Sequence, residues 1–197
     1  MKCDIVLAGV GGQGVLSLAA AITSSAMTEK LWVKQSEVHG MAQRGGAVMA
    51  TLRMADHEIF SDLIPLGTAS MILGMEPMES LRYLPYLSLQ GTLLTSVNPV
   101  RNIPDYPDLD ALTVQIRALP RSIIVDAEKL ARYAGSAHAT NMVMVGAALH
   151  LLPFKAQTVE DAVRTVFARK GDRVVEINLR ARRAGRDASA SSMLVRE

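Results

Sequence analysis

The stretch that decides the fold lies at the start of the chain and reads Cys3-Asp4-Ile5-Val6-Leu7-Ala8-Gly9-Val10-Gly11-Gly12-Gln13-Gly14. Its first part, residues 3–8, is a short apolar run bounded by glycine, which is typical of a buried parallel strand. Gly9, Gly11 and Gly14 then match the G-x-G-x-x-G pattern, and apolar residues at helical spacing follow from Val15. The stretch therefore predicts a strand, a tight glycine turn and a helix, which together open a Rossmann-like fold.

The rest of the chain repeats this strand-then-helix rhythm. The pattern predicts further strands at residues 31–35, 47–53, 69–74, 91–97 and 122–126, and a short one around 113–116. It predicts helices over 76–87, 127–133, 141–151 and 158–169, and a last helix or strand over 173–183. Alternation of this kind predicts an α/β fold of three layers, a mostly parallel sheet with helices on both faces.

Local signals set the expected boundaries of the later helices and of the domain. Asn141 is expected to cap the helix that it begins, and Thr158 with Asp161 three residues on resembles a capping pair. The arginines of 180–186 are expected to form a solvated helix end. The length of 197 residues suits one domain. We expect it to occupy residues 1–185, followed by a small, polar and mobile tail over 186–197.

The composition excludes several classes of function. The chain has one cysteine, Cys3, so it cannot by itself hold an iron–sulfur cluster, a thiolate zinc site or a disulfide framework. Its four histidines are too scattered to indicate a metal site. Three Phe, four Tyr and one Trp are too few for a platform that stacks single-stranded nucleic acid. The net charge is only +2, so we expect no nucleic-acid partner.

No targeting segment or membrane span is predicted from the apolar runs. Glycines interrupt the first apolar run within a few residues, whereas a signal peptide needs an uninterrupted stretch of about 7–15. No window approaches the ~18 apolar residues of a membrane-spanning helix. We therefore expect a cytoplasmic protein with no membrane partner.

The glycine turn, formed by Gly9, Gly11, Gly12, Gln13 and Gly14, is a candidate site for a phosphate or for coenzyme A. Such a turn lets a phosphate approach the backbone and directs helix N-terminal amides at it. The acidic residue expected some 20 positions on, which binds a ribose in dinucleotide sites, has only Glu37 as a candidate. The alternative interpretation, which we favour, is that the glycines only form the turn, because fold alone does not establish a ligand.

A second glycine-rich loop combines unusual residues between two predicted strands, and it reads Ser36-Glu37-Val38-His39-Gly40-Met41-Ala42-Gln43-Arg44-Gly45-Gly46. Glu37, His39, Gln43, Arg44 and the pair Gly45–Gly46 are its candidate binding residues. Arg44 could present a forked donor to a phosphate or a carboxylate. The alternative is a loop locked against a partner subunit, and we favour that interpretation slightly. We assign no catalytic residue, His39 included, because no nucleophile or metal cluster accompanies it.

Together the two loops resemble the gamma subunit or domain of the 2-oxoacid:ferredoxin oxidoreductases. The resemblance covers roughly residues 3–185. Within that family, the chain resembles the indolepyruvate branch. It continues through four further motifs, which are Glu76-Pro77-Met78-Glu79, Asn98-Pro99, Asn141-Met142-Val143-Met144-Val145-Gly146 and Asn178-Leu179-Arg180-Ala181.

The resemblance implies an activity for a complex rather than for this chain alone. The family reaction is oxidative decarboxylation of a 2-oxoacid, here an indolepyruvate or another arylpyruvate, to an acyl-CoA with ferredoxin as electron acceptor. It implies that thiamine diphosphate, magnesium and iron–sulfur clusters lie in a larger alpha subunit, and that coenzyme A is a co-substrate. The thiamine motif, Gly-Asp-Gly followed by Asn-Asn, is absent, since the nearest fragment is Gly171-Asp172-Arg173.

The expected partners are therefore the alpha subunit and, through the complex, ferredoxin. The isolated chain is expected to be inactive and able to form a homodimer through the surface meant for alpha. The alternative is a stand-alone Rossmann-like protein that binds a nucleotide or dinucleotide, against which the doubtful ribose partner Glu37 counts.

Overall fold

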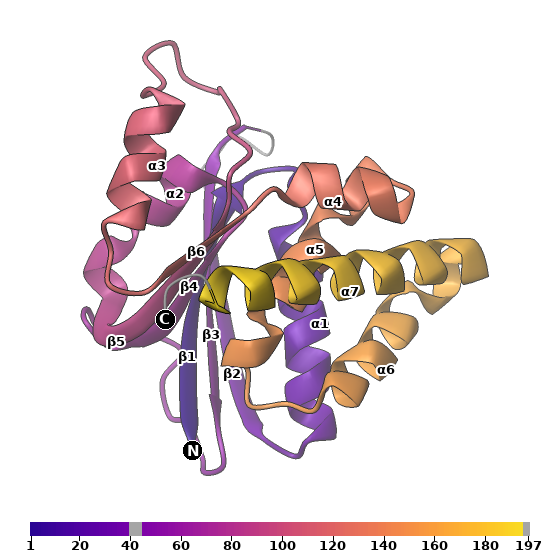
Figure 1. Ribbon diagram of the computed structural model, residues 1–197. Coiled ribbons are helices and arrows are strands. Elements are labelled where there is room, and N and C mark those ends of the chain that lie inside the picture. Colours follow the sequence, from indigo (N-terminus) through magenta and orange to yellow (C-terminus); the bar gives the residue numbers. More distant parts are fainter. Residues whose placement is uncertain (40–44, 195–197) are drawn as a thin grey trace.

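The computed structural model describes residues 1–39 and 45–194, and within them a six-stranded sheet forms the centre of the molecule (Figure 1). Its strands lie in the order β2-β3-β1-β4-β5-β6. Their bounds are β1 (Lys2–Val10), β2 (Trp32–His39), β3 (Ala47–Ala55), β4 (Ala69–Gly74), β5 (Leu87–Ser96) and β6 (Ser122–Val125). The pairs β1–β4, β4–β5 and β5–β6 are parallel, whereas β3 runs antiparallel to both β1 and β2. The sheet is thus mostly parallel, as predicted.

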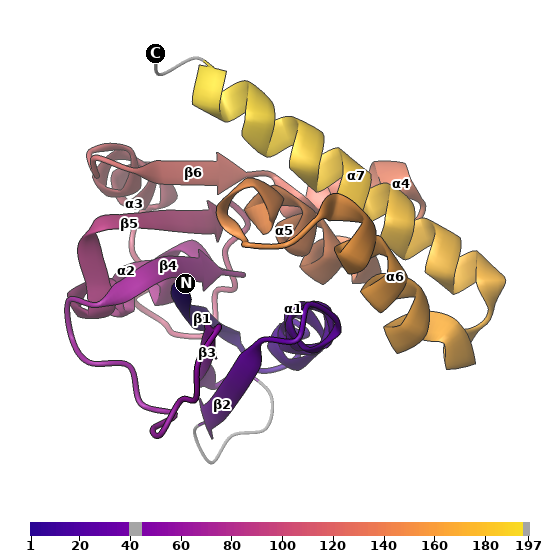
Figure 2. The ribbon, with the colours of Figure 1, turned by 90° about the horizontal axis from the view of Figure 1, so that it is seen from below.

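Helices cover both faces of the sheet, which confirms the three-layer α/β architecture (Figure 2). One face carries α2 (Pro77–Arg82) and α3 (Leu109–Arg117). The other carries α1 (Val15–Thr28), α4 (Ala127–Ala134), α5 (Thr140–Ala148), α6 (Ala156–Phe167) and α7 (Asp172–Leu194). Short 3-10 turns lie at Leu84–Tyr86, Ala137–Ala139, Leu149–Leu151 and Ala168–Lys170. No helix in the described part of the chain is long and apolar enough to span a bilayer.

Two hydrophobic clusters lie on opposite faces of the sheet because side chains alternate along each strand. In β1, Ile5 and Leu7 enter the larger cluster beneath α1 and α5, while Val6 enters the smaller one with Ile116 of α3. All three β1 side chains are fully buried. The continuous apolar run of β1 therefore reflects a strand covered on both sides.

The helices α5 and α7 cross with their backbones in contact. A Cβ atom added to Gly146 of α5 would lie 1.9 Å from the carbonyl oxygen of Arg182, and one added to Gly185 of α7 would lie 1.9 Å from that of Val143. Both distances are far inside van der Waals contact, so neither position can hold a side chain without a shift of the helices.

Two of the predicted local structures are wrong in the middle of the chain. Residues 113–116 form part of α3 and not a strand, because Leu112 and Ile116 are buried at helical spacing and Asp108 caps the helix through the Ala111 amide. Asn141 does not cap α5, which begins at Thr140. Its side-chain oxygen accepts a hydrogen bond from the Met142 amide instead.

Three further predictions near the C-terminus also fail. Helix α6 begins at Ala156, and Thr158, inside it, donates to Glu29, which directly follows α1, rather than capping α6. Arg182 is 2% exposed and pairs with Glu160, so the arginine cluster is not uniformly solvated. The tail expected over 186–197 is helical as far as Leu194, and Ser189 is fully buried there. Small Ala and Ser side chains, which suggested a mobile segment, allow α7 to pack closely.

Candidate functional site

The candidate site lies at the carboxyl edge of the sheet, where the parallel strands β1, β4, β5 and β6 end together. The connection after β1 leads to α1 on one face, and the connection after β4 leads to α2 on the other (Figure 2). Between β1 and β4 the chain therefore changes the face on which it places helices. In open α/β sheets a crevice at such a switch point is the usual position of a ligand.

The predicted glycine turn occupies this switch point. Gly12 and Gly14 have φ values of 101° and 80°, a region that residues with side chains rarely adopt. Gly9 is needed for packing, since a Cβ atom there would lie 2.9 Å from Cγ2 of Val15 in α1. Gly12 is exposed, and nothing lies within 4 Å of the position that its Cβ atom would take. The turn therefore packs closely against α1 at Gly9 and has open space around Gly12.

The side chain of Gln13 links β1 to the segment after β4 across the switch point. Its side-chain oxygen accepts a hydrogen bond from the Val10 amide of β1 at 2.8 Å, and its Nε2 donates to the carbonyl of Met75, just after β4, at 3.1 Å. Both ends of the side-chain amide are therefore engaged with the backbone. In this arrangement Gln13 holds the turn in shape, and its own backbone amide donates to the Val10 carbonyl at 3.1 Å.

The N-terminus of α1 is the part of the turn best suited to an anion. Gly14 is the N-cap residue, and no side chain caps the helix. The first intrahelical bond runs from the Leu18 amide to the Gly14 carbonyl. Uncapped amides and the helix dipole favour a phosphate or carboxylate at this end.

The two glycine-rich loops lie against each other. The Gly11 amide donates to the Gly46 carbonyl at 2.8 Å, and the Gly45 amide donates to the Gly11 carbonyl at 3.3 Å. These bonds extend the β1–β3 pairing, whose last register pair is Val10–Ala47. Gln43 and Arg44 lie outside the described residues, as does the side chain of His39. Two motifs that are separate in the sequence therefore form one surface.

Glu37 and His39 were predicted to lie in a loop, but they belong to the edge strand β2, two strands away from β1. The register places Gly9, Val48 and His39 in one row across the sheet, and Leu7, Ala50 and Glu37 in another. Two strand spacings amount to about 10 Å. In a dinucleotide-binding fold the ribose-binding acid ends the strand next to β1. Here β3 is inserted, so Glu37 is too far away for that role.

A buried polar cluster follows β4 and β5, and the sequence-based site omitted it. Glu76 is fully buried and Glu79 is 1% exposed. One carboxylate oxygen of Glu76 accepts from the Glu79 amide at 2.8 Å, which caps α2, and the other accepts from the Tyr106 hydroxyl and from the Val100 amide at 3.4 Å. Glu79 is paired with Arg82.

Burial sets the acid–base properties of this cluster. Removal from water raises the pKa of Glu76, and the hydrogen bond from Tyr106 opposes that rise in part. Burial and the neighbouring Glu76 carboxylate together raise the pKa of Tyr106. The hydroxyl of Tyr106 therefore stays protonated and donates to the carboxylate. An aromatic residue between Pro104 and Pro107 in a loop is the sequence signal that could have identified this contact.

The loop that contains Tyr106 also reaches the glycine loops. The side-chain amide of Asn102 donates to the Gly45 carbonyl. At the base of the loop, Asn98 binds Asp126 at 3.1 Å and accepts from the Glu128 amide at 3.0 Å, beside the start of α4. The segments that follow β1, β4, β5 and β6, and the two glycines before β3, are thereby joined at one edge of the sheet.

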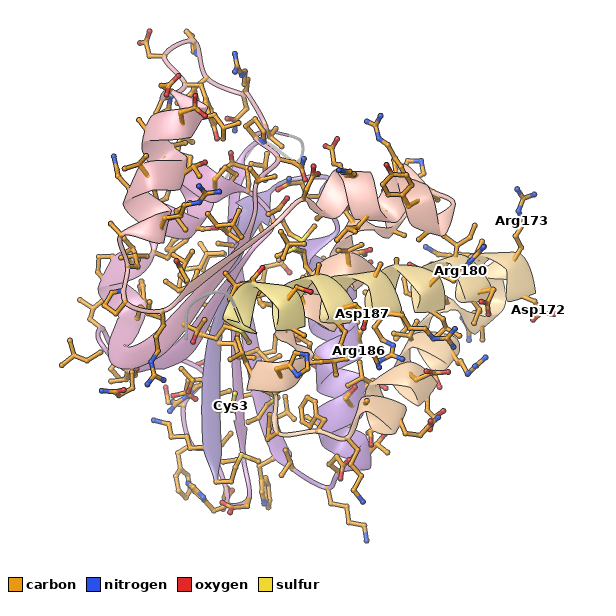
Figure 3. All side chains as sticks on the ribbon, in the orientation of Figure 1. Cys3, Asp172, Arg173, Arg180, Arg186 and Asp187 are labelled. Carbon is orange, nitrogen blue, oxygen red and sulfur yellow. The ribbon has the colours of Figure 1, made fainter. Side chains whose placement is uncertain are left out.

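The residues that the structure describes do not fit an iron–sulfur cluster or another metal centre. Among the described residues no group of three or more His, Cys, Asp or Glu is placed to hold a metal ion. Cys3 lies near the opposite, amino end of β1 (Figure 3), where burial and then the neighbouring Asp4 raise the pKa of its thiol to about 11. The thiol is therefore protonated and unreactive, and it takes no part in the candidate site.

Comparison with known proteins agrees with the geometry. The family model described as pyruvate ferredoxin/flavodoxin oxidoreductase matches residues 4–188. The chain is 38% identical to indolepyruvate oxidoreductase subunit IorB of Archaeoglobus fulgidus, over 97% of both chains. It is 36% identical to the subunit of the same name from Methanothermobacter thermautotrophicus, over 98% of this chain and all of the relative.

Solved structures share the fold at lower sequence identity. Pyruvate oxidoreductase subunit PORC of Thermotoga maritima superposes with a TM-score of 0.74 at 21% identity, over 95% of this chain and 96% of that one. A 2-oxoglutarate:ferredoxin oxidoreductase of Magnetococcus marinus, solved with 2-oxoglutarate, coenzyme A and succinyl-CoA bound, gives 0.76 at 19%. That match covers 96% of this chain and 31% of the longer one.

The two glycine loops carried the original resemblance, and the fold and the match over nearly the whole chain agree with it. The chain belongs to the pyruvate ferredoxin/flavodoxin oxidoreductase family.

Proposed function

We propose that this chain is the smaller subunit of an indolepyruvate ferredoxin oxidoreductase. The complex would decarboxylate an arylpyruvate oxidatively, join the acyl group to coenzyme A and pass the electron pair to ferredoxin. The observation that supports this most strongly is the identity of 34–38% to subunits named IorB in four species, with this chain covering 91% or more of each. Relatives of matching length support a separate subunit of the same kind.

The proposal assigns the redox cofactors to a larger alpha subunit. A cluster needs about four thiolates, and the whole chain holds one cysteine, which is buried. The fragment Gly171-Asp172-Arg173 lies at the start of α7. Thiamine diphosphate with magnesium supplies the electron sink for decarboxylation in that subunit, and its clusters carry the electrons. Such a complex would work in the cytoplasm.

The carboxyl edge gives this subunit a positioning role. The glycine turn, with the uncapped N-terminus of α1, suits a phosphate of coenzyme A. The loops around it would close the entrance to the alpha subunit's active site and exclude water. Such a subunit contributes by orientation and by desolvation rather than by breaking or forming bonds.

Co-expression with the alpha subunit tests the proposal. The purified complex is expected to reduce ferredoxin or a viologen dye when indolepyruvate and coenzyme A are both present. Each subunit alone is expected to be inactive, and mixing them is expected to restore activity. Full activity of alpha by itself, or failure of the two chains to co-purify, would contradict the assignment.

A further inference from the structure

One carboxylate oxygen holds both limbs of the loop between β5 and α3. Val100 lies on the outgoing limb and Tyr106 on the returning limb, and the Val100 amide and the Tyr106 hydroxyl both donate to Oε1 of Glu76. The five residues between these two contacts project beyond the carboxyl edge, and they include exposed Arg101 and Asn102. Glu76 therefore joins the two limbs at the base of the loop, and we call Glu76 with its contacts to Val100 and Tyr106 the clip.

The clip itself is fixed to the core of the molecule. The second oxygen of Glu76 accepts from the Glu79 amide, and its backbone carbonyl accepts the Ser80 hydroxyl at 2.6 Å. Ser80 also meets the hydroxyl of Thr95 on β5 at 2.7 Å, and all these side chains except Glu79 are fully buried, with Glu79 at 1% exposed. The loop is therefore anchored to a part of the fold that cannot easily move.

The projecting end of the loop is linked to the glycine turn by hydrogen bonds. Asn102 donates to the Gly45 carbonyl, the Gly45 amide donates to the Gly11 carbonyl, and Gly11 belongs to the turn. A continuous series of contacts thus runs from Glu76 through the loop to the turn. Three prolines, Pro99, Pro104 and Pro107, restrict the loop backbone further.

We propose that Glu76 and Tyr106 are positioning residues that hold the loop 100–106 so that Asn102 fixes Gly45 and the glycine turn in their ligand-binding shape. The ligand is the phosphate portion of coenzyme A, and this part rests on the function proposed above. Neither residue touches the reacting atoms. They act through Asn102 and Gly45 on the backbone amides of the turn.

Tyr106→Phe isolates the effect of the clip. The substitution removes the hydroxyl that binds the returning limb and leaves the Glu76 cap on α2 in place. Asn102→Ala removes the next contact in the series. Tyr133→Phe is the matched control, because Tyr133 is 78% exposed on α4 and takes no part in the clip.

Hydrogen exchange of the isolated chain gives the first readout. In both Tyr106→Phe and Asn102→Ala, the Gly11 and Gly45 amides are expected to exchange about fivefold faster, the effect of losing one ordinary hydrogen bond. The control is expected to match the wild type. Faster exchange confined to residues 100–106, or no change at all, would overturn the proposal.

Kinetics of the assembled complex give the second readout. In Tyr106→Phe the KM for coenzyme A is expected to rise about fivefold while kcat stays within about twofold, because binding is weakened but chemistry is not. An unchanged KM, or a loss confined to kcat, would overturn the proposal. A wild-type complex without activity dependent on coenzyme A would refute the proposed function instead, and the exchange result would then still decide whether the clip orders the turn.

Discussion

Glycines serve opposite purposes in two regions of the molecule, the carboxyl edge of the sheet and the crossing of α5 with α7. At the carboxyl edge, Gly12 has a φ of 101° and nothing within 4 Å of where a Cβ atom would lie. At the crossing, Gly146 and Gly185 lie in ordinary helix, but a Cβ atom there would meet a carbonyl oxygen at 1.9 Å. Gly12 leaves open space beside the turn, whereas Gly146 and Gly185 allow the backbones of two helices to pack against each other.

The difference distinguishes the region that we propose to bind a ligand from a region that stabilises the fold. The carboxyl edge carries uncapped amides, short contacts between loops and exposed backbone, which are features that bind ligands or partners. In the α5–α7 layer, α5 is buried from Asn141 to Ala148, and α7 buries the charge of Arg182. Substitutions in that layer should therefore lower stability, and substitutions at the edge should weaken binding.

The largest expected effect is that of Gly146→Ala. One methyl group forces α5 away from the Arg182 carbonyl, so we expect the free energy of unfolding to fall by about 3 kcal/mol or more. Urea unfolding followed by circular dichroism measures it. Gly67→Ala is the control, since Gly67 has a φ of 71° but open space around it, and we expect a loss of only about 1 kcal/mol there. Equal losses would contradict the tight crossing.

A comparison of Glu160→Gln with Arg182→Met tests the buried charge in the same layer. Glu160→Gln leaves Arg182 buried without a carboxylate, so we expect a loss of about 3 kcal/mol. Arg182→Met leaves Glu160 its other partners, Arg164 and Arg183, and removes two buried donors, Nε and Nη1, that have no partner among the described residues. We expect a change within about 1 kcal/mol. Thermal unfolding of both variants checks the asymmetry, and a larger loss in Arg182→Met would refute it.

At the carboxyl edge, Gly12→Ala is expected to behave differently. The added methyl group enters the open space above the turn and strains the backbone, which lowers stability by only about 1 kcal/mol. If a phosphate occupies that space, the KM of the complex for coenzyme A should rise about tenfold, because the group can no longer approach the amides. Steady-state kinetics with varied coenzyme A measure this effect. An unchanged KM would place the ligand elsewhere.

The smallest effect concerns Cys3. Its thiol is buried and has a pKa of about 11, so at pH 8 only about one thousandth is thiolate. Iodoacetamide should leave the native chain unmodified for hours and label it fully in urea, with mass spectrometry as the readout. Rapid labelling of the native chain would show that the amino end of β1 opens readily.

The sequence predicted most of the fold because its signals were local. The strand, turn and helix of residues 3–28 need only an apolar run, glycines and helical spacing, and they are confirmed. The segment 113–116 was misassigned because a short apolar run fits a strand or a helix equally well. Residues 186–194 were misassigned because α7 continues through them and buries Ser189 by long-range packing that no local pattern records.

The candidate site was predicted in part for the same reason. Its glycine loops were recognisable, but their contact through Gly11 and Gly46 depends on β3 pairing with β1. The insertion of β3, which separates Glu37 from β1, could not be inferred from spacing along the chain. The clip between Glu76 and Tyr106 joins positions 30 residues apart, so composition and periodicity alone did not identify it.

We propose that the carboxyl edge faces the alpha subunit's active site, whereas the α5–α7 layer stabilises the fold. Hydrogen exchange of this chain, free and in complex with alpha, tests it most directly. The account predicts protection on binding at residues 11–14, 45–46 and 98–106, with little change along the outer face of α6 and α7. Protection confined to α6 and α7, with the glycine turn unchanged, would contradict it.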